Sequence, residues 1–473
     1  MSRIKTFGTV DERSLEQLRR CMDAGDAELA VLCADHHPGY SQPIGGGIAY
    51  EGYVSPSGVG YDIGCGNKAA RTGLTRVDLD ELGGVVRVMD EITRRISFGV
   101  GVPAQERVDH PVLDEIRRAD FAPQQKLAQL AESQLGTVGS GNHYVNVMED
   151  EQGRIWVGVH FGSRGFGHKT ASGFLALADG KRFDERAVEG EMDSPPVLFE
   201  VGSELGDAYI AAMELAGEYA YAGRDIVVAN VLEILGAEAV HEVHNHHNFA
   251  WREEHFGRRY WVIRKRCTPA RPGQEGFVGG SMADESVILE GVESADNAEA
   301  LYSTVHGAGR VMSRSQAAGR VRHRKRWACT WRDCAYVADE PGSCPEHGSP
   351  LRKARVLEQV KPGLVDWPAV QARLREQGIV LVGGGRTRRP RSTSASRRCS
   401  VPTAARSASS TPCVRSASPW PGAMWSTRTR TEGRASGPQS FPCARRVSAL
   451  RRSPTTARCS GSAGRCSSGR TSP

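Results

Sequence analysis

The 473-residue sequence contains no apolar run that approaches the roughly 18 residues of a membrane-spanning helix. Its opening residues, MSRIKTFGTVDERSLEQLRR, lack the apolar core of a secretory signal. Its composition, 39% hydrophobic and 25% charged, is typical of soluble globular proteins. We therefore expect a folded enzyme that resides in the cytoplasm.

The cysteines do not form a recognisable disulfide framework. Of the 12 cysteines, five follow Gly385, and the other seven are scattered or stand beside histidines and glycines. Dense disulfide frameworks belong mainly to small secreted domains, which this chain does not resemble. We interpret the cysteines that stand beside histidines and glycines as metal ligands.

Most of the chain also lacks an excess of basic charge. Residues 386–473 hold 18 arginines and a single acid, Glu432, so they contribute +17 to the net charge of +6 and leave the first 385 residues at −11. Bulk charge therefore gives no support for nucleic-acid binding. Any affinity for phosphate must come from local arginines and bound cations.

The hydrophobic pattern predicts one large mixed α/β domain over residues 1–385. Asp11 to Asp23 is expected to form a capped amphipathic helix at its edge, and Glu204 to Val231 a long helix. From Leu29 to Leu74, short apolar runs broken by glycine predict strands joined by tight turns. The runs IWVGVHFG and YWVIRK predict buried strands.

Two segments depart from this pattern. Residues 323–355 form a compact cysteine-rich insertion within the domain, with a C-x4-C-x9-C-x2-H spacing that could hold a structural zinc ion; a reduced, metal-free surface loop is the alternative. The four residues are Cys329, Cys334, Cys344 and His347. The tail, residues 386–473, has only five Val, Leu, Ile and Phe residues in total, so we expect it to be disordered.

Candidate metal ligands stand on turns marked by glycine. Asp62 and Cys65 are three apart in YDIGCGNKAA, His143 lies in GSGNHYVNV, and His160 lies in GVHFGSRGFG. The segment HEVHNHHNFA adds His241, His244, His246 and His247, some of which a solvated helix face could explain. Singly, each is more often structural than a ligand. Together, an acid, a thiolate and several imidazoles match a borderline transition metal better than magnesium or calcium.

A further histidine, His306 in STVHGAGRVMSR, stands ahead of two glycines and Arg310. Glycine-rich turns expose backbone N–H groups that can hold phosphate, and an arginine can add a charge-assisted contact. A neutral imidazole beside such a turn can attack phosphorus and form a phosphoramidate. A structural histidine before a glycine turn is the alternative.

The motifs DIGCG, GSGNH, HFGSRG, HHNFA, RKRCTPA, GGSM and HGAGRVMSR resemble, in this order, the RtcB family of RNA-splicing ligases. The resemblance covers essentially all of residues 1–385. It implies a catalytic domain of the RtcB type that is dependent on GTP and two manganese ions.

The resemblance also implies residue roles. Asp62, Cys65 and His143 would hold one manganese ion, and Cys65, His160 and His247 the second, with the thiolate as the bridge. His306 would be the residue that becomes guanylylated, and Arg164 is a candidate contact for an RNA phosphate. The contacts to nucleotide, phosphate or metal would come from Asn142, Asn248, Ser281, Ser286, Gly307, Ala308, Gly309 and Arg310.

The implied reaction joins RNA ends. GMP would pass from His306 to an RNA 3′-phosphate, itself formed by opening a 2′,3′-cyclic phosphate, and a 5′-hydroxyl would then displace GMP. The implied partners are GTP, RNA such as transfer RNA halves or broken RNA, and an archease-type activator. The alternatives are a catalytically impaired RtcB-like protein that binds nucleotide or RNA, and a metal-dependent phosphohydrolase.

The chain departs from the family pattern at several positions. Asn146 stands where the family usually has glutamate, which removes a negative charge near the nucleotide. The usual RKGAT reads as residues 264–268, RKRCT, and the usual Pro-Gly-Ser reads as residues 279–281, GGS. These changes indicate a divergent subgroup.

We predict that the tail from Arg386 is an out-of-frame translation product; a lineage-specific basic tail that binds RNA is the alternative. The tail has no lysine or isoleucine, as a GC-rich gene read out of frame would give. Synonymous codons exist for Gly385 to Ser396 whose shifted frame reads Pro-Asp-Glu-Ala-Pro-Glu-Val-Tyr-Lys-Arg-Leu. That string resembles the segment expected in the family, whose lysine contacts the bound guanylate.

The gene sequence tests this prediction, because its shifted frame should encode Asp-Glu-Ala-Pro and Tyr-Lys. Restoring the frame should improve folding and raise the yield of GMP adduct. Equal yields from the two chains, or a shifted frame without those residues, would contradict it.

Overall fold

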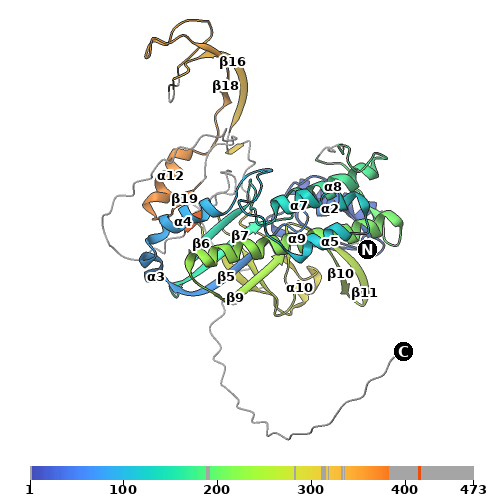
Figure 1. Cartoon of the computed structure of the whole chain (residues 1–473). Coiled ribbons are helices and arrows are strands. Elements are labelled where there is room, and N and C mark those ends of the chain that lie inside the picture. The colour runs from blue at the N-terminus through green and yellow to red at the C-terminus, as the bar shows by residue number, and fades with distance from the viewer. Residues whose placement is uncertain are drawn as a thin grey trace, which may run out of the picture.

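The computed structural model describes residues 3–187, 192–281, 284–309, 316–317, 319–331, 334, 336–382 and 414–416. Helices and strands together form one large mixed α/β domain, which confirms the predicted fold class (Figure 1). Arg310 and most of the tail lie outside the described residues. The described helices are α1 (Glu12–Ala24), α2 (Pro56–Val59), α3 (Arg76–Glu81), α4 (Gly84–Arg95), α5 (Pro111–Arg118), α6 (Ala122–Gln125), α7 (Ala128–Gln134), α8 (Arg164–Ala178), α9 (Glu204–Leu235), α10 (Ala295–Glu299) and α12 (Trp367–Glu376).

A five-stranded sheet, in the order β1-β2-β3-β11-β10, forms one part of the domain. Helix α1 packs on β2 and β3 and buries Leu18 and Met22. Asp11 caps this helix, because its carboxylate accepts a hydrogen bond of 2.8 Å from the backbone N–H of Ser14. The predicted capped helix is therefore confirmed. The strands are β1 (Arg3–Thr6), β2 (Leu29–His37), β3 (Ile44–Tyr50), β10 (Asn248–His255) and β11 (Arg258–Lys265).

A six-stranded sheet, in the order β19-β20-β6-β7-β5-β9, forms another part. Strand β7 contains IWVGVHF and β11 contains YWVIRK, so both predicted buried strands are confirmed. Strand β20 belongs to the tail and pairs with β6 and β19, which is more order than we expected for these three residues. The strands are β5 (Gly66–Thr75), β6 (Tyr144–Glu149), β7 (Arg154–Phe161), β9 (Ala239–His246), β19 (Leu381–Val382) and β20 (Val414–Ser416).

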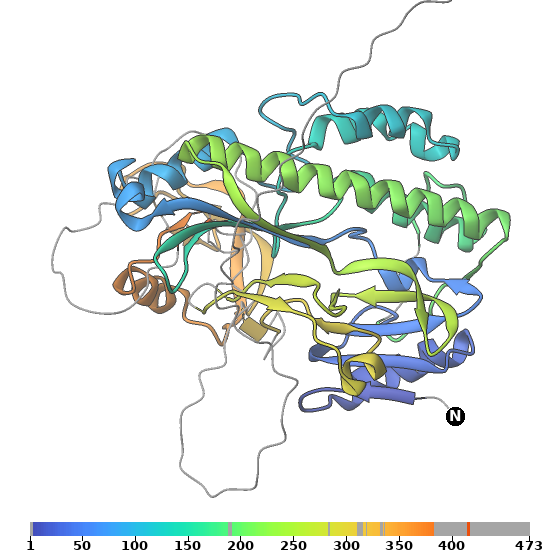
Figure 2. The same ribbon diagram turned by 90° about the horizontal axis from the view of Figure 1, so that it is seen from below.

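Helix α9 connects two hydrophobic cores. It starts after the N-cap Ser203 and continues to Leu235, beyond the predicted end at Val231. Tyr209 and Met213 in its first half pack into a core with α1 and β3, whereas Val227 and Val231 in its second half pack into a core with α4 and β7. Figure 2 shows this long helix running across the molecule beside the strands. One helix therefore fixes the two sheets relative to each other.

Short strand pairs complete the body of the domain. Strand β4 pairs with β8, β12 with β15, and β13 with β14. The segment 29–74, predicted as strands and turns, also contains the short helix α2. These strands are β4 (Tyr53–Val54), β8 (Phe199–Glu200), β12 (Cys267–Pro269), β13 (Glu275–Val278), β14 (Val287–Glu290) and β15 (Ser303–Val305).

The histidine-rich segment HEVHNHHNFA does not form a helix, so the reading of a solvated helix face is wrong. It forms the end of β9, a turn at His247 and the start of β10. In a strand, successive side chains point to opposite faces, and here His246 is buried while His241 and His244 are partly exposed. His244 and His246 therefore share one face of β9, where both contact Arg224, while His241 points to the opposite face.

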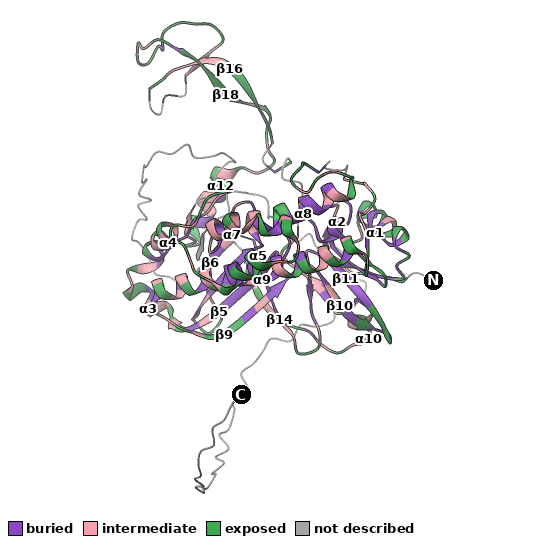
Figure 3. Ribbon diagram, turned by 45° about the vertical axis from the view of Figure 1, so that its right-hand side comes forward, coloured by how far each residue is buried: buried purple, intermediate pink, exposed green. Residues whose placement is uncertain are grey.

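The predicted insertion is the outer part of a long antiparallel hairpin. Strands β16 (Arg320–Ala328) and β18 (Arg352–Lys361) pair along their length, and β17 (Val337–Ala338) adds to β16 near the tip. The hairpin extends away from the body, and many of its residues are exposed (Figures 1 and 3). It is wider than the predicted 323–355. We refer to residues 320–361 as the arm.

Of the helices in the described part of the chain, none combines the length and the apolar character that a membrane span requires.

Candidate functional site

The turn before β5 carries the first two predicted ligands. Cys65 is fully buried, and its backbone N–H donates a hydrogen bond of 3.0 Å to the carbonyl of Asp62, which closes the turn. Gly64 has a φ of +68°, a backbone conformation that favours glycine. The turn therefore directs the carboxylate and the thiol toward the same region.

His143, just before β6, and His160, in the neighbouring strand β7, lie close to the thiol of Cys65. The Sγ atom of Cys65 lies 3.9 Å from His143 Nε2 and 3.8 Å from His160 Nε2. The ligand atoms of the three residues all lie within 4.8 Å of one another. His143 Nε2 also lies 3.0 Å from a carboxylate oxygen of Asp62. Residues 62, 65, 143 and 160, predicted from separate motifs, are thus brought together.

Hydrogen bonds orient both imidazoles. His143 Nδ1 donates to the carbonyl of Val138 at 3.0 Å, and His160 Nδ1 donates to the side-chain oxygen of Asn67 at 2.6 Å. Each ring therefore turns the lone pair of Nε2 toward Cys65, as ligand-orienting partners do in metal sites. Burial, together with the charge of His143, lowers the pKa of His160 well below its usual value, which favours the neutral form that binds metals.

His247 lies against this cluster in the turn between β9 and β10. Its ring centroid is 5.1 Å from that of His160, and its backbone N–H donates to the carbonyl of Cys65 at 2.8 Å. Its Nε2 atom is buried and has no hydrogen-bond partner among the described residues. A buried polar atom without a partner is costly, and a bound cation would relieve that cost.

His306 stands on the other side of His247, with ring centroids 5.1 Å apart. Asp35, at the end of β2, lies behind it, with a carboxylate oxygen 2.6 Å from His306 Nδ1 and 3.1 Å from the His306 backbone N–H. Burial opposes ionisation of Asp35, but the interactions with His306 outweigh it and lower the pKa of the carboxyl. Asp35 thereby occupies the Nδ1 side of the ring, and Nε2 lies on the other side.

Two glycine-rich segments meet beside His306. Gly307 forms an isolated bridge with Gly279, and Gly309 has a φ of +73°. Gly280 donates its backbone N–H to the hydroxyl of Ser286 at 3.0 Å, and the hydroxyl of Ser281 contacts the carboxylate of Asp284. The predicted nucleotide contacts Ser281 and Ser286 and the predicted phosphate contacts of residues 307–309 therefore lie in neighbouring segments.

The two predicted asparagines contact the ligand cluster. Asn142 donates its side-chain N–H to His160 Nε2 at 2.9 Å. Asn248 donates to the carbonyl of Asp62 at 3.2 Å and accepts from the backbone N–H of Arg266 at 2.7 Å. Asn248 is thus already engaged in holding the turns of the site together.

Arg164, predicted to contact an RNA phosphate, forms hydrogen bonds within the protein. Its guanidinium donates to Thr137 Oγ1 and to the carbonyl of Gly99, both at 3.2 Å. Burial lowers its pKa, and Asp62 opposes that effect. A side chain at Gly139, where φ is +93°, would collide with this guanidinium. Arg164 therefore packs under the turn that precedes His143.

Sequence reasoning missed three residues that shape the site: Asp35, Asn67 and Arg224. Asp35 and Asn67 follow apolar or glycine-marked segments next to predicted elements, which could have identified them. Arg224 is followed by Asp225 in the largely apolar run YAYAGRDIVVANV and is completely buried. A charged residue within a largely apolar helical pattern indicates a buried polar contact.

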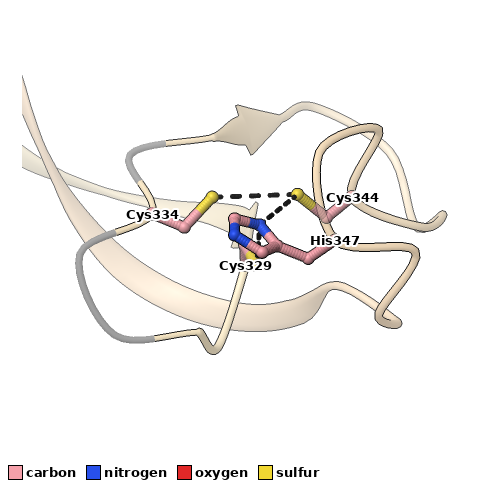
Figure 4. A group of neighbouring side chains, drawn as sticks. All are labelled: Cys329, Cys334, Cys344 and His347. Carbon is pink, nitrogen blue, oxygen red and sulfur yellow. Dashed lines mark hydrogen bonds between the residues drawn. The ribbon is translucent and has the colours of Figure 1, made fainter.

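A second cluster lies at the tip of the arm, where the four predicted zinc ligands converge (Figure 4). Their ligand atoms all lie within 4.8 Å of one another. Cys344 Sγ lies 3.5 Å from His347 Nδ1 and 3.7 Å from Cys334 Sγ, and Cys329 Sγ lies 3.9 Å from His347 Nδ1. The wide C-x4-C spacing does not prevent them from meeting.

Known proteins match this chain over most of its body. The family described as tRNA-splicing ligase RtcB matches residues 17–121 and 114–340. The RNA-splicing ligase RtcB of Escherichia coli (strain K12) is 33% identical over 318 residues, which cover 61% of this chain and 75% of that relative. The tRNA-splicing ligase RtcB of Thermococcus kodakarensis is 31% identical over 389 residues, which cover 66% of this chain and 79% of the relative.

A third relative, the tRNA-splicing ligase RtcB of Archaeoglobus fulgidus, is 32% identical over 395 residues, which cover 67% of this chain and 80% of the relative. The family match spans the turns that carry the Cys65 and His306 motifs. Together, the motifs, their convergence in the fold and the matches over most of the body lead to one assignment: the chain belongs to the RtcB family.

Proposed function

We propose that this protein is a GTP- and manganese-dependent RNA ligase that joins 2′,3′-cyclic phosphate or 3′-phosphate ends to 5′-hydroxyl ends. One observation carries the proposal. His306 lies next to His247 and the Cys65 cluster on one side, beside the glycine segments on another, and has Asp35 against its Nδ1 atom. Relatives of the chain carry the name RNA-splicing ligase, which supports the same reaction class.

The donor set fits two ions of a borderline transition metal. Asp62, Cys65 and His143 would hold one manganese ion, and Cys65, His160 and His247 the other. The partnerless Nε2 atom of His247 and the convergence of the other donors on Cys65 support this assignment. When bound, the two cations would neutralise the triphosphate and favour the departure of pyrophosphate.

His306 would attack the α-phosphorus of GTP through Nε2. The lone pair of Nε2 forms the P–N bond while the bond from phosphorus to the bridging oxygen breaks, and pyrophosphate leaves with that electron pair. The imidazole gains positive charge in this step. The carboxylate of Asp35, at 2.6 Å from Nδ1, would stabilise that charge and hold the ring in position.

The glycine segments would bind the phosphates. Backbone N–H groups of residues 307–309 and the nearby Ser281 and Ser286 would contact the nucleotide, and Arg310, outside the described residues, would add a charge. Asn142, which lies against His160, would orient either the phosphates or the ligand.

Two transfers would then complete the reaction. An oxygen of an RNA 3′-phosphate attacks the phosphorus bound to His306, the P–N bond breaks, and the imidazole returns to its neutral form. The oxygen of a 5′-hydroxyl next attacks the RNA phosphorus and GMP leaves, while the hydroxyl proton passes to solvent. A 2′,3′-cyclic phosphate must first be opened by water to a 3′-phosphate.

Labelled GTP tests the nucleophile. With α-labelled GTP and manganese, the parent chain and His241→Ala should form an acid-labile, alkali-stable protein adduct, and His306→Ala should form none. His241 is a suitable control because it is a partly exposed histidine of β9 that pairs with Glu275. Asp35→Asn should form the adduct about 10²-fold more slowly, because the ring loses its charged partner.

The rival activities give different results in the same assay. Release of phosphate from GTP without an adduct would support a phosphohydrolase, and nucleotide binding with neither product would support a binding protein. Either result would refute the proposed ligase.

Metal analysis tests the ligand assignment separately. Cys65→Ala and His160→Ala should lose bound manganese and with it the adduct, whereas His306→Ala should keep its metal. Cys21→Ala is the matched control, since Cys21 is also a buried free cysteine but lies in the α1 core. Elemental analysis that finds the same manganese content in Cys65→Ala and the parent would exclude the bridging thiolate.

We also propose that the four residues at the tip of the arm bind a structural zinc ion. Three thiols and one imidazole are a common tetrahedral zinc set, and their convergence supports it. Cys344→Ser should lose about one zinc per chain and retain the adduct on His306, while Cys21→Ala should retain both. A Cys344→Ser preparation with as much zinc as the parent would disprove this site.

A further inference from the structure

The arm concentrates positive charge on a body that is acidic. Its paired strands β16 and β18 contain nine Lys and Arg residues and one acid, Glu358, whereas the first 385 residues as a whole carry −11. Strand β16 pairs with β18 on one side and with β17 on the other. The hairpin extends away from the sheets of the body (Figures 1 and 3). Repulsion among these positive charges destabilises the hairpin, so we looked for a role that the charge could serve.

The register divides these charges between two faces of the hairpin. Directly opposite residues in antiparallel strands point to the same side. On one face, Arg322 and Arg324 both pair with Glu358, at 3.3 and 3.7 Å, and Arg326 pairs with Asp339 at 2.7 Å. Arg352, opposite Ala328, also lies on this face, so three of its four arginines are paired with acidic side chains of the arm.

The other face carries Lys325, Trp327, Lys353 and Arg355, which we call the basic face. Lys325 stands directly opposite Arg355, and Trp327 directly opposite Lys353, whose ammonium lies 5.9 Å from the centre of the indole ring. Within the described part of the chain, none of the three cations of this face has an ion-pair partner. The three cations are exposed and the indole is half-buried.

The pair Lys325 and Arg355 is unfavourable by itself. Like charges directly opposite each other on a sheet face are destabilising, and β-branched or aromatic residues would stabilise the hairpin more. If a polyanion were bound between Lys325 and Arg355, attraction of both cations to it would replace their mutual repulsion as the larger effect. The adjacent indole offers a flat surface on which an unpaired base can stack, a combination that single-stranded nucleic acids use.

We propose that the basic face of the arm binds the sugar-phosphate backbone of single-stranded RNA, with one base stacked on Trp327. The choice of RNA rests on the proposed function, since a ligase for RNA ends must hold strands near those ends. Lys325, Lys353 and Arg355 contact phosphates, which makes binding dependent on salt and largely independent of sequence. The acidic body then directs RNA toward the arm.

Binding of an RNA that cannot be sealed tests the proposal. The probe is a fluorescent single-stranded RNA with a 5′-phosphate and a 3′-hydroxyl, titrated without GTP. Lys325→Ser/Arg355→Ser should bind at least about tenfold more weakly than the parent, and the slope of log K against log salt should fall by about 1.4 because two phosphate contacts are lost. Trp327→Ala should weaken binding without changing that slope.

The matched control is Arg19→Ser/Arg87→Ser, which removes two exposed cations from α1 and α4 of the body. It should bind RNA as the parent does. Equal losses in the two double variants would show that only net charge matters, and parental affinity in the arm variant would show that the arm does not bind RNA; each result overturns the proposal. Retained zinc and an unchanged circular dichroism spectrum verify that the arm variant is folded.

The same preparations separate this proposal from the ligase assignment. The arm variant should form the GMP adduct on His306 as the parent does, because the basic face has no part in that step. A parent chain that forms no adduct but binds RNA through the arm would refute the ligase and support the arm. If the parent chain forms the adduct but the arm variant binds RNA as tightly as the parent, the ligase is supported and the role of the arm is refuted.

Discussion

The ligand cluster depends on one buried cation, the guanidinium of Arg224. It projects from α9 and donates to the carbonyls of Gly64 and Phe161, at 2.8 and 2.6 Å, and to His244 at 2.8 Å. These acceptors belong to the three segments that carry the candidate metal ligands. Burial lowers the pKa of Arg224 only to about 10, so it is charged at neutral pH. Moving any one of the three segments away would leave this buried charge with fewer partners, which is costly. Arg224 therefore holds the three segments together.

Two carboxylates, the partly buried Asp62 and the buried Asp35, each face a different imidazole of the site. Asp62 faces His143 within the thiol cluster, where a carboxylate and an imidazole can share a cation. Asp35 faces His306 and contacts its ring nitrogen and its backbone N–H, which fixes the orientation of this ring. The carboxylate partners therefore distinguish the proposed ligand His143 from the proposed nucleophile His306.

Two arginines near the site, Arg164 and Arg266, have positive φ values, a conformation that favours glycine. Arg266, which stands where the family usually has glycine, has a φ of +52°, a conformation that costs free energy for a residue with a side chain. Its backbone N–H binds Asn248, and its charge lies close enough to lower the pKa of His160 and His247, after the effect of burial. The strain coincides with added positive charge beside the proposed phosphate site. Strain at a functional position is a recurring feature of active sites.

The sequence by itself determined the local elements and the chemistry of the single motifs. Periodicity and an N-cap identified α1, apolar runs identified β7 and β11, and residue types identified Cys65 and His306 as reactive candidates, because these signals act between near neighbours. Only the tertiary structure decided that the histidine-rich segment forms two strands joined by a turn, that Asp35 contacts His306, and that the basic residues of β16 and β18 divide between a face that carries ion pairs and the basic face. Those outcomes depend on strand register and on contacts between segments far apart in the chain, which no local pattern encodes.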